Sequence, residues 1–153
     1  MLASRRDALL ISSAALLLPA EAALAKPELR APGPTGFMDV FHVFATPDGK
    51  SHLRRVKVAA SRKALPDASV MATTLAAGVE DWHNAPFKTF TINIAGRIRA
   101  ELSDGSQQLI GPGDLVFLED LHGKGHVTHL LTTCASLFLH MPDDFDFLAW
   151  ARG

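Results

Sequence analysis

The stretch KTFTINIAGRIRAELSDGSQQLIGPGDLVFL, residues 88–118, decides the fold class of this chain. Short runs rich in Val, Ile, Leu, Phe and Thr alternate there with turn sequences that contain glycine, aspartate or proline. Branched and aromatic residues favour strands, whereas Gly, Asp and Pro favour the tight turns between strands. The stretch therefore predicts four consecutive strands, at Lys88–Ile94, Arg97–Leu102, Gln107–Ile110 and Leu115–Leu118.

The same pattern continues on both sides of this stretch. It predicts further strands at Met38–Ala45, Leu53–Ala59, Val70–Ala77, Val127–Thr133 and Ala135–Met141. No interval between them holds a helix long enough for the crossover that parallel neighbours need, so we expect an antiparallel sheet. Strands at such short, regular spacing predict an all-β barrel or sandwich.

Only the C-terminal end of the chain shows a helical pattern. Phe145, Leu148 and Ala149 recur at the spacing of one helix face, and Asp143 or Asp144 is placed to cap the helix. We therefore expect a short C-terminal helix that covers the barrel and contributes no chemistry of its own.

The composition limits the classes of function. A chain of 153 residues suits one domain, and a formal net charge of −1 argues against a nucleic-acid partner, because such proteins need an excess of Lys and Arg. The only cysteine, Cys134, has no second thiol with which to form an internal disulfide or a zinc knuckle. Cysteine chemistry is therefore not expected.

The N-terminal 25 residues are typical of a secretory signal peptide. Arg5 and Arg6 precede an apolar run at 8–18, which is shorter than a membrane-spanning helix, and Ala23-Leu24-Ala25 has the small residues of a cleavage site. The double arginine resembles a twin-arginine export signal. The alternatives are a general secretory signal, an uncleaved anchor or a buried helix. We expect a periplasmic or secreted protein with no membrane span in its mature form.

The segment that follows the signal divides into two parts. Residues 26–36 hold three prolines and two glycines, so we expect an irregular arm that leads into the domain. The domain itself is expected to cover residues 37–153.

Two segments resemble the two motifs of the cupin superfamily. GVEDWHNAPFKTFTINIAG, residues 78–96, places His83 and Gly96 at the spacing of the first motif, and the run from Gly111 to His126 ends on the histidine of the second. The resemblance implies a jelly-roll barrel, often paired as a homodimer. It also implies that His83 and His126 bind one divalent transition metal, Fe, Mn, Zn or Ni, inside the barrel.

The chain departs from the family pattern at three positions. The second histidine of the first motif falls on Ala85, the glutamate on Thr89 and the closing asparagine of the second motif on Leu130. Catalytic metals generally use three protein ligands, and only two of the family's ligands are present. The chain is more narrowly similar to small bacterial cupins with W-H-x-A-P and E-D-x-x-G-K-G-H sequences.

Strand alternation identifies the candidate ligand-binding residues. Side chains along a strand point to opposite faces in turn, so Thr89, Thr91 and Asn93 share one face and Thr128 shares a face with His126. If the threonine face is the interior, Phe90, Ile92 and Ile94 pack outward against a second sheet. The alternative is that the polar row faces solvent. By the same alternation, His129 points away from His126.

Two further residues are candidates because they lie beside the motif histidines. Glu119 ends a hydrophobic run, where a carboxylate could serve as a general base or as an anionic metal ligand near His126. The alternative is a loop carboxylate paired with Lys124. Trp82 could stack on a ligand at the mouth of the barrel, or it could be core. The remaining histidines, His42, His52, His122 and His140, show no spacing that converges on this pair.

These observations lead to two principal hypotheses for function. The first is an exported, metal-dependent enzyme of lyase, isomerase or dioxygenase type that acts on a small polar organic molecule. The alternative is a metal-free module that binds or senses a small molecule without turnover, which the replacements at Ala85 and Thr89 favour. A third hypothesis is a structural or partner-docking β-sandwich, in which the histidines only pack against their neighbours.

Overall fold

The structure is a computed structural model that describes residues 36–59 and 64–152. The predictions of a signal peptide and of most of the Pro/Gly-rich arm lie outside these residues. The described strands are β1 (Phe37–Ala45), β2 (Ser51–Ala59), β3 (Ser69–Leu75), β4 (Gly78–His83), β5 (Thr89–Ala95), β6 (Ile98–Leu102), β7 (Gln107–Ile110), β8 (Leu115–Glu119), β9 (His126–Leu130) and β10 (Cys134–His140). One helix, α1 (Phe147–Arg152), follows them.

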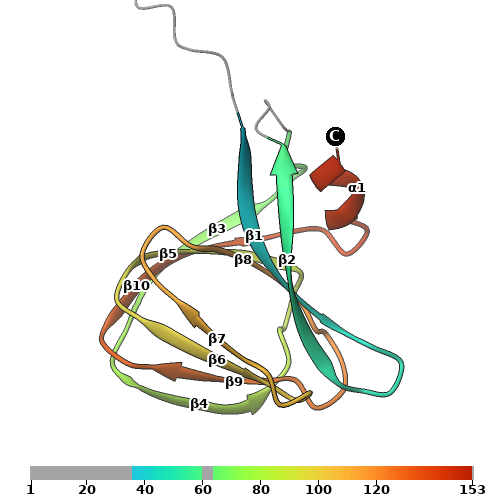
Figure 1. Cartoon of the computed structure of the whole chain (residues 1–153). Coiled ribbons are helices and arrows are strands. Elements are labelled where there is room, and N and C mark those ends of the chain that lie inside the picture. The colour runs from blue at the N-terminus through green and yellow to red at the C-terminus, as the bar shows by residue number, and fades with distance from the viewer. Residues whose placement is uncertain (1–35, 60–63, 153) are drawn as a thin grey trace, which may run out of the picture. The chain divides into compact units, whose positions relative to one another are not determined.

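The strands form two sheets that face each other. The larger sheet has the order β2-β1-β8-β5-β10-β3 and the smaller one has the order β4-β9-β6-β7. Figure 1 shows the smaller sheet on one side of the larger one and α1 on the other. The prediction of an all-β protein with a short C-terminal helix is confirmed.

The prediction of a single antiparallel barrel is wrong in two respects. In the described part of the chain, no hydrogen-bonded strand pair joins an edge of one sheet to an edge of the other, so the sheets form an open sandwich. In addition, β1 pairs with β8 in parallel. The chain passes through both sheets between these two strands, and a connection of that length allows parallel pairing without a crossover helix.

The sequence pattern did not predict β4. The predicted strand Val70–Ala77 corresponds to β3, and β4 follows it directly after a short break. β4 is an edge strand whose side chains are mostly exposed, so its sequence lacks the alternation that a half-buried strand shows.

The core has two layers because both faces of the larger sheet are covered. Between the sheets lies a cluster that includes Phe41, Leu102 and Val116. On the outer face, Phe90 and Phe117 pack against the C-terminal segment. Phe90 therefore contacts the C-terminal segment rather than the second sheet, and Ile94 is exposed. The predicted outward direction of Phe90 is right, but the predicted partner is wrong.

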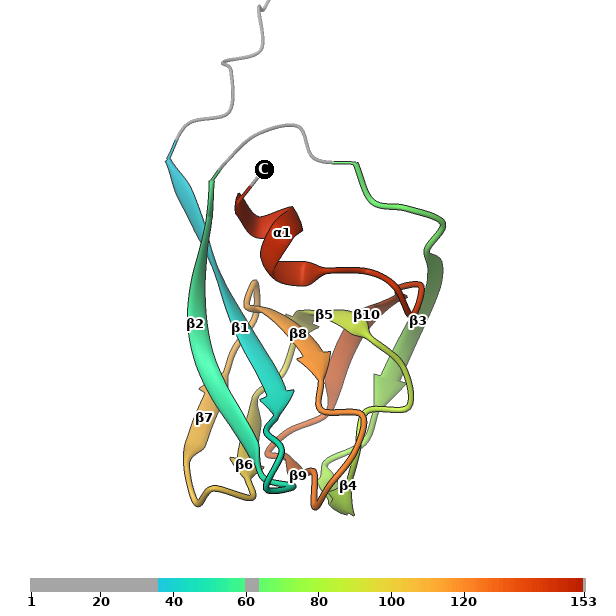
Figure 2. The same cartoon turned by 90° about the vertical axis from the view of Figure 1, so that its right-hand side faces the viewer.

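The C-terminal segment crosses the outer face of the larger sheet and ends in α1 (Figure 2). The side chain of Asp146 accepts a hydrogen bond of 2.9 Å from the backbone N–H of Ala149. Asp146, and not the predicted Asp143 or Asp144, is therefore the N-cap. No helix in the described residues has the length and hydrophobicity needed to cross a bilayer.

Candidate functional site

A cavity of about 310 Å³ lies between the two sheets. Most of its wall is apolar and comes from the inner faces of both sheets, with residues such as Val43, Ile98 and Leu118. Nine of the 21 residues that line it have polar side chains, but these contribute only a small part of the wall's surface. Such a cavity, apolar with a few convergent polar groups, is typical of a site for a small organic ligand.

His126 begins β9 and reaches the cavity wall with its imidazole almost fully buried. Its Nδ1–H donates a hydrogen bond of 2.7 Å to Oδ2 of Asp120, a residue with no exposed surface. The same carboxylate oxygen accepts a hydrogen bond of 2.9 Å from the hydroxyl of Ser51. These contacts fix the orientation of the ring and leave Nε2 available to the cavity.

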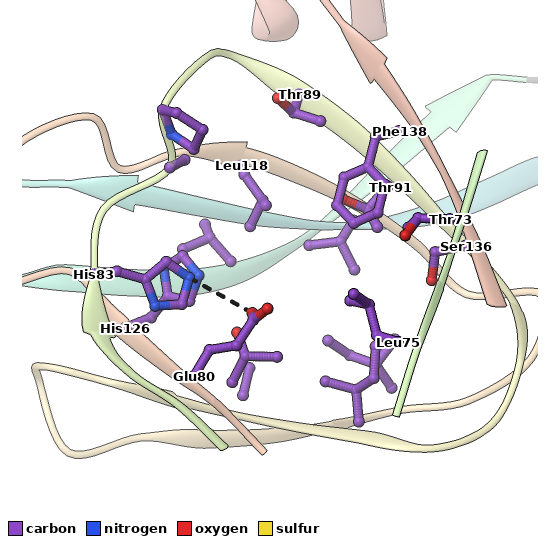
Figure 3. A pocket seen from close by; sticks show the side chains of 18 of the residues that line it. Thr73, Leu75, Glu80, His83, Thr89, Thr91, Leu118, His126, Ser136 and Phe138 are labelled. Carbon is purple, nitrogen blue, oxygen red and sulfur yellow. Dashed lines mark ion pairs between the residues drawn. The ribbon is translucent and has the colours of Figure 1, made fainter. Parts of the chain in front are cut away.

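His83 ends β4 and lies opposite His126 in the register of β4 and β9. Its Nδ1–H donates to the backbone oxygen of Asp81 at 2.7 Å, so its other ring nitrogen, Nε2, is the one that Glu80 approaches. The two imidazole centroids are 4.4 Å apart with an interplanar angle of 58°. Figure 3 shows both rings at one end of the cavity.

Glu80 lies beside His83 in the cavity wall, although its position three residues before His83 predicts that it points to the opposite face. Residues three apart on a regular strand point to opposite faces, but a bulge between Glu80 and His83 shifts the register by one. As a result, both side chains line the cavity, and Oε2 of Glu80 lies 4.0 Å from Nε2 of His83. Strand alternation alone could not have identified this residue.

Gly125 allows the start of β9 to lie close to the end of β4. Gly125 has a φ of +76°, and a Cβ at this position would overlap the backbone oxygen of His83. Only glycine allows the start of β9 to approach the end of β4 this closely. The backbone at Gly125 therefore positions His126 beside His83.

Three of the predicted ligand-binding residues line the cavity, namely Thr89, Thr91 and Thr128. Asn93 shares the inner face but lies outside the wall. Its amide donates to the backbone oxygen of Gly96 at 3.0 Å, which holds the turn after β5. His140, which the sequence did not single out, also lines the cavity and lies 3.2 Å from the hydroxyl of Thr89.

Trp82 does not reach the cavity wall. Trp82 is adjacent to His83 on β4, so its side chain points to the opposite face of the strand. There, Nζ of Lys124 lies 4.0 Å from the centroid of the indole ring. Its exposed fraction of 37% is also inconsistent with a core position. The indole and Lys124 form a cation–π pair on the outside of the smaller sheet.

Glu119 also lies away from the two motif histidines. Its carboxylate contacts Nε2 of His42 at 2.9 Å and Nζ of Lys88 at 3.4 Å. Nδ1 of His42 accepts a hydrogen bond from Arg54, so Nε2 carries the proton that His42 donates to Glu119. Burial raises the pKa of Glu119, but the hydrogen bond from His42 and the charge of Lys88 outweigh it and hold this pKa below its usual value. The predicted pairing with Lys124 is replaced by these contacts.

The comparisons with known proteins give similarity in structure alone. No family model matches the sequence, and no curated protein matches it. Protein NMB1881 from Neisseria meningitidis is similar at 12% identity and a TM-score of 0.40, over 53% of this chain and 89% of that one. A Salmonella typhimurium chain, whose name describes it as an ethanolamine utilization protein Q, is similar at 18% identity and a TM-score of 0.32, over 71% and 99% of the two chains.

Proposed function

We propose that this protein is a cupin-type enzyme that binds a small organic molecule in the cavity. In this proposal, His126 removes a proton from the bound molecule. The observation that carries the proposal is the buried pair of Asp120 and His126, which fixes an imidazole in the wall of an apolar cavity. The motif positions of His83 and His126 and the two-sheet architecture support the cupin assignment. The apolar wall favours a substrate with an apolar body over the polar molecule expected from the sequence.

The residues at this end of the cavity suit removal of a proton next to a carbonyl group. Nε2 of His126 would take the proton, and Asp120 would stabilise the resulting imidazolium through the Nδ1–H hydrogen bond. His83 in its protonated form would donate from Nε2 to the carbonyl oxygen, where negative charge develops. His126 and His83 are then the catalytic residues, and Asp120 is a positioning residue.

The family resemblance also implies a metal, and the donor set tests that implication. Both Nδ1 atoms are already engaged, so each histidine offers one nitrogen. Among the described residues, no group of three or more His, Cys, Asp or Glu side chains is placed to hold an ion. These residues do not fit a catalytic metal site, which generally needs three protein ligands, so the chemistry proposed here runs through the imidazoles. Metal content remains a prediction from the resemblance.

A second candidate is a module that binds the same molecules without turnover. The observation that favours it is the predominance of apolar side chains in the cavity wall, which supplies affinity but no chemistry. Binding is common to both candidates, and turnover separates them.

Nuclear magnetic resonance of the histidine side chains tests the binding step. A panel of small aldehydes, ketones and alcohols is titrated into the wild-type protein, and we expect saturable shifts of the His83 and His126 imidazole signals. His52→Gln is the matched control, because His52 contacts Thr46 and Asp104 outside the cavity. His83→Gln should weaken binding and His52→Gln should not. If no compound shifts the two signals, or if both variants weaken binding equally, the site is wrong.

A further inference from the structure

We infer that the cavity has a second polar end at Thr91, and that its substrate carries hydrogen-bonding groups at both ends of an apolar chain. The inference rests on the proposed function for the imidazole end. It adds the chemical class of the substrate and a residue that determines specificity.

The hydroxyl of Thr91 is buried without a hydrogen-bond partner. Thr91 lies on the inner face of β5, is 8% exposed and lines the cavity. In the part of the chain that the structure describes, its Oγ1 has no partner. The neighbouring inner-face residue differs, since the hydroxyl of Thr89 donates to the backbone oxygen of Phe87 at 2.9 Å. Burial alone therefore does not explain why the Thr91 hydroxyl is unpaired, because the hydroxyl of Thr89, also buried on this strand, has a hydrogen-bond partner.

Two other residues with hydroxyl groups line the cavity at this end. Thr73 of β3 and Ser136 of β10 are register partners and line the same cavity. Figure 3 shows Thr91, Thr73 and Ser136 at one end of the cavity, with the two imidazoles at the other. Leu118 lies in the wall between the two ends.

This arrangement discriminates between ligands at the far end. A buried polar group without a partner destabilises the structure, and a ligand hydroxyl or carbonyl that bonds to it removes that penalty. A ligand with an apolar end leaves the penalty in place. Sites built to pair a buried polar group reject analogues that lack the matching group more strongly than apolar pockets discriminate by size. Thr91 should therefore select molecules with a polar group at the far end.

The test uses straight-chain α,ω-diols of roughly four to eight carbons and the mono-alcohols of the same lengths, which differ only in the far hydroxyl. Dissociation constants are measured by the imidazole signals for the wild type, Thr91→Val and Thr74→Val. Valine has nearly the shape of threonine, and Thr74 is an exposed threonine on β3 outside the cavity wall. The cost of transferring the extra hydroxyl from water cancels when the difference between diol and mono-alcohol is compared between the wild type and each variant.

We expect Thr91→Val to weaken the best diol about fivefold and to leave its mono-alcohol unchanged or bound more tightly. Thr74→Val should change neither, and urea unfolding of Thr91→Val should show no loss of stability. Equal effects of Thr91→Val on diol and mono-alcohol overturn the inference while the proposed function stands. If neither class of alcohol shifts the His83 and His126 signals while an aldehyde or ketone does, the inference is overturned and the proposed function stands. If no aldehyde, ketone or alcohol shifts them, the proposed function itself fails.

Discussion

At the scale of single residues, Glu119 and Asp120 at the end of β8 are adjacent in sequence but contact different histidines. Asp120 contacts His126, and Glu119 contacts His42. Val116 and Leu118 of β8 line the cavity, so alternation continues to Asp120 on the inner side, and Glu119 points outward. The sequence hypothesis placed a carboxylate beside His126 but chose the wrong one of the pair. Extending the alternation of the strand by two residues would have identified Asp120.

Replacing each carboxylate by its amide separates the two roles. In Asp120→Asn, the hydrogen-bond acceptor of His126 loses its charge inside the core, and we expect a loss of about 1–3 kcal/mol in the free energy of unfolding. The His126 ring should also populate both tautomers, which ¹⁵N chemical shifts measure. Glu119→Gln is the matched control, because it alters a carboxylate on the opposite face and should leave the His126 tautomer unchanged. An unchanged tautomer in Asp120→Asn contradicts the assigned role.

Glu119→Gln should instead alter the dependence of stability on pH. A carboxyl group whose pKa is lowered on folding stabilises the protein above its unfolded pKa, and this contribution disappears as the pH falls through the folded value. The difference in unfolding free energy between wild type and Glu119→Gln should therefore be largest near neutral pH and should shrink as the pH falls below 4.5, the ordinary pKa of a glutamate side chain. Urea unfolding at a series of pH values measures it. A difference that grows in acid contradicts the contacts described for Glu119.

At the scale of elements, the junction of β4 and β9 assembles the imidazole end of the cavity. Short strands rich in branched residues and separated by turns were predictable, because their alternation reflects burial. β4 was not predictable in this way, because it is an exposed edge strand. Its bulge, which brings Glu80 to the cavity, depends on pairing with β9, and the sequence of β4 alone does not encode it.

Gly125→Ala tests this junction. Alanine at a φ of +76° costs about 1–2 kcal/mol, and its Cβ would also overlap the backbone of His83, for a total of about 2–5 kcal/mol. Gly105→Ala is the control, because Gly105 has a φ of +91° with no heavy atom within 4 Å of an added Cβ. Gly125→Ala should lose more stability in urea unfolding and should weaken the proton–proton contact between the His83 and His126 rings. Equal losses in both variants, with the contact retained, contradict the close approach.

At the scale of the whole molecule, the two faces of the larger sheet differ in what they contact. Its outer face buries aromatic side chains against the C-terminal segment, and its inner face lines the cavity. The sequence predicted these two faces of β5, since alternation sorts side chains by direction. It predicted a C-terminal helix that covers the barrel but not that this segment covers the outer face of β5, because Phe145 and Phe147 reach Phe90 only through the tertiary fold. Local patterns contain no information about such distant contacts.

The central claim is that the imidazole end of the cavity moves protons on a bound molecule. The most direct measurement is deuterium exchange next to the carbonyl group of those aldehydes and ketones that bind, followed by proton NMR in D₂O. The account predicts exchange faster than in buffer, with a loss of about 100-fold in His126→Gln and a smaller loss in Asp120→Asn, while Glu119→Gln retains the wild-type rate. Exchange no faster than in buffer, or equal rates in wild type and His126→Gln, would contradict the claim and leave a binding module without turnover.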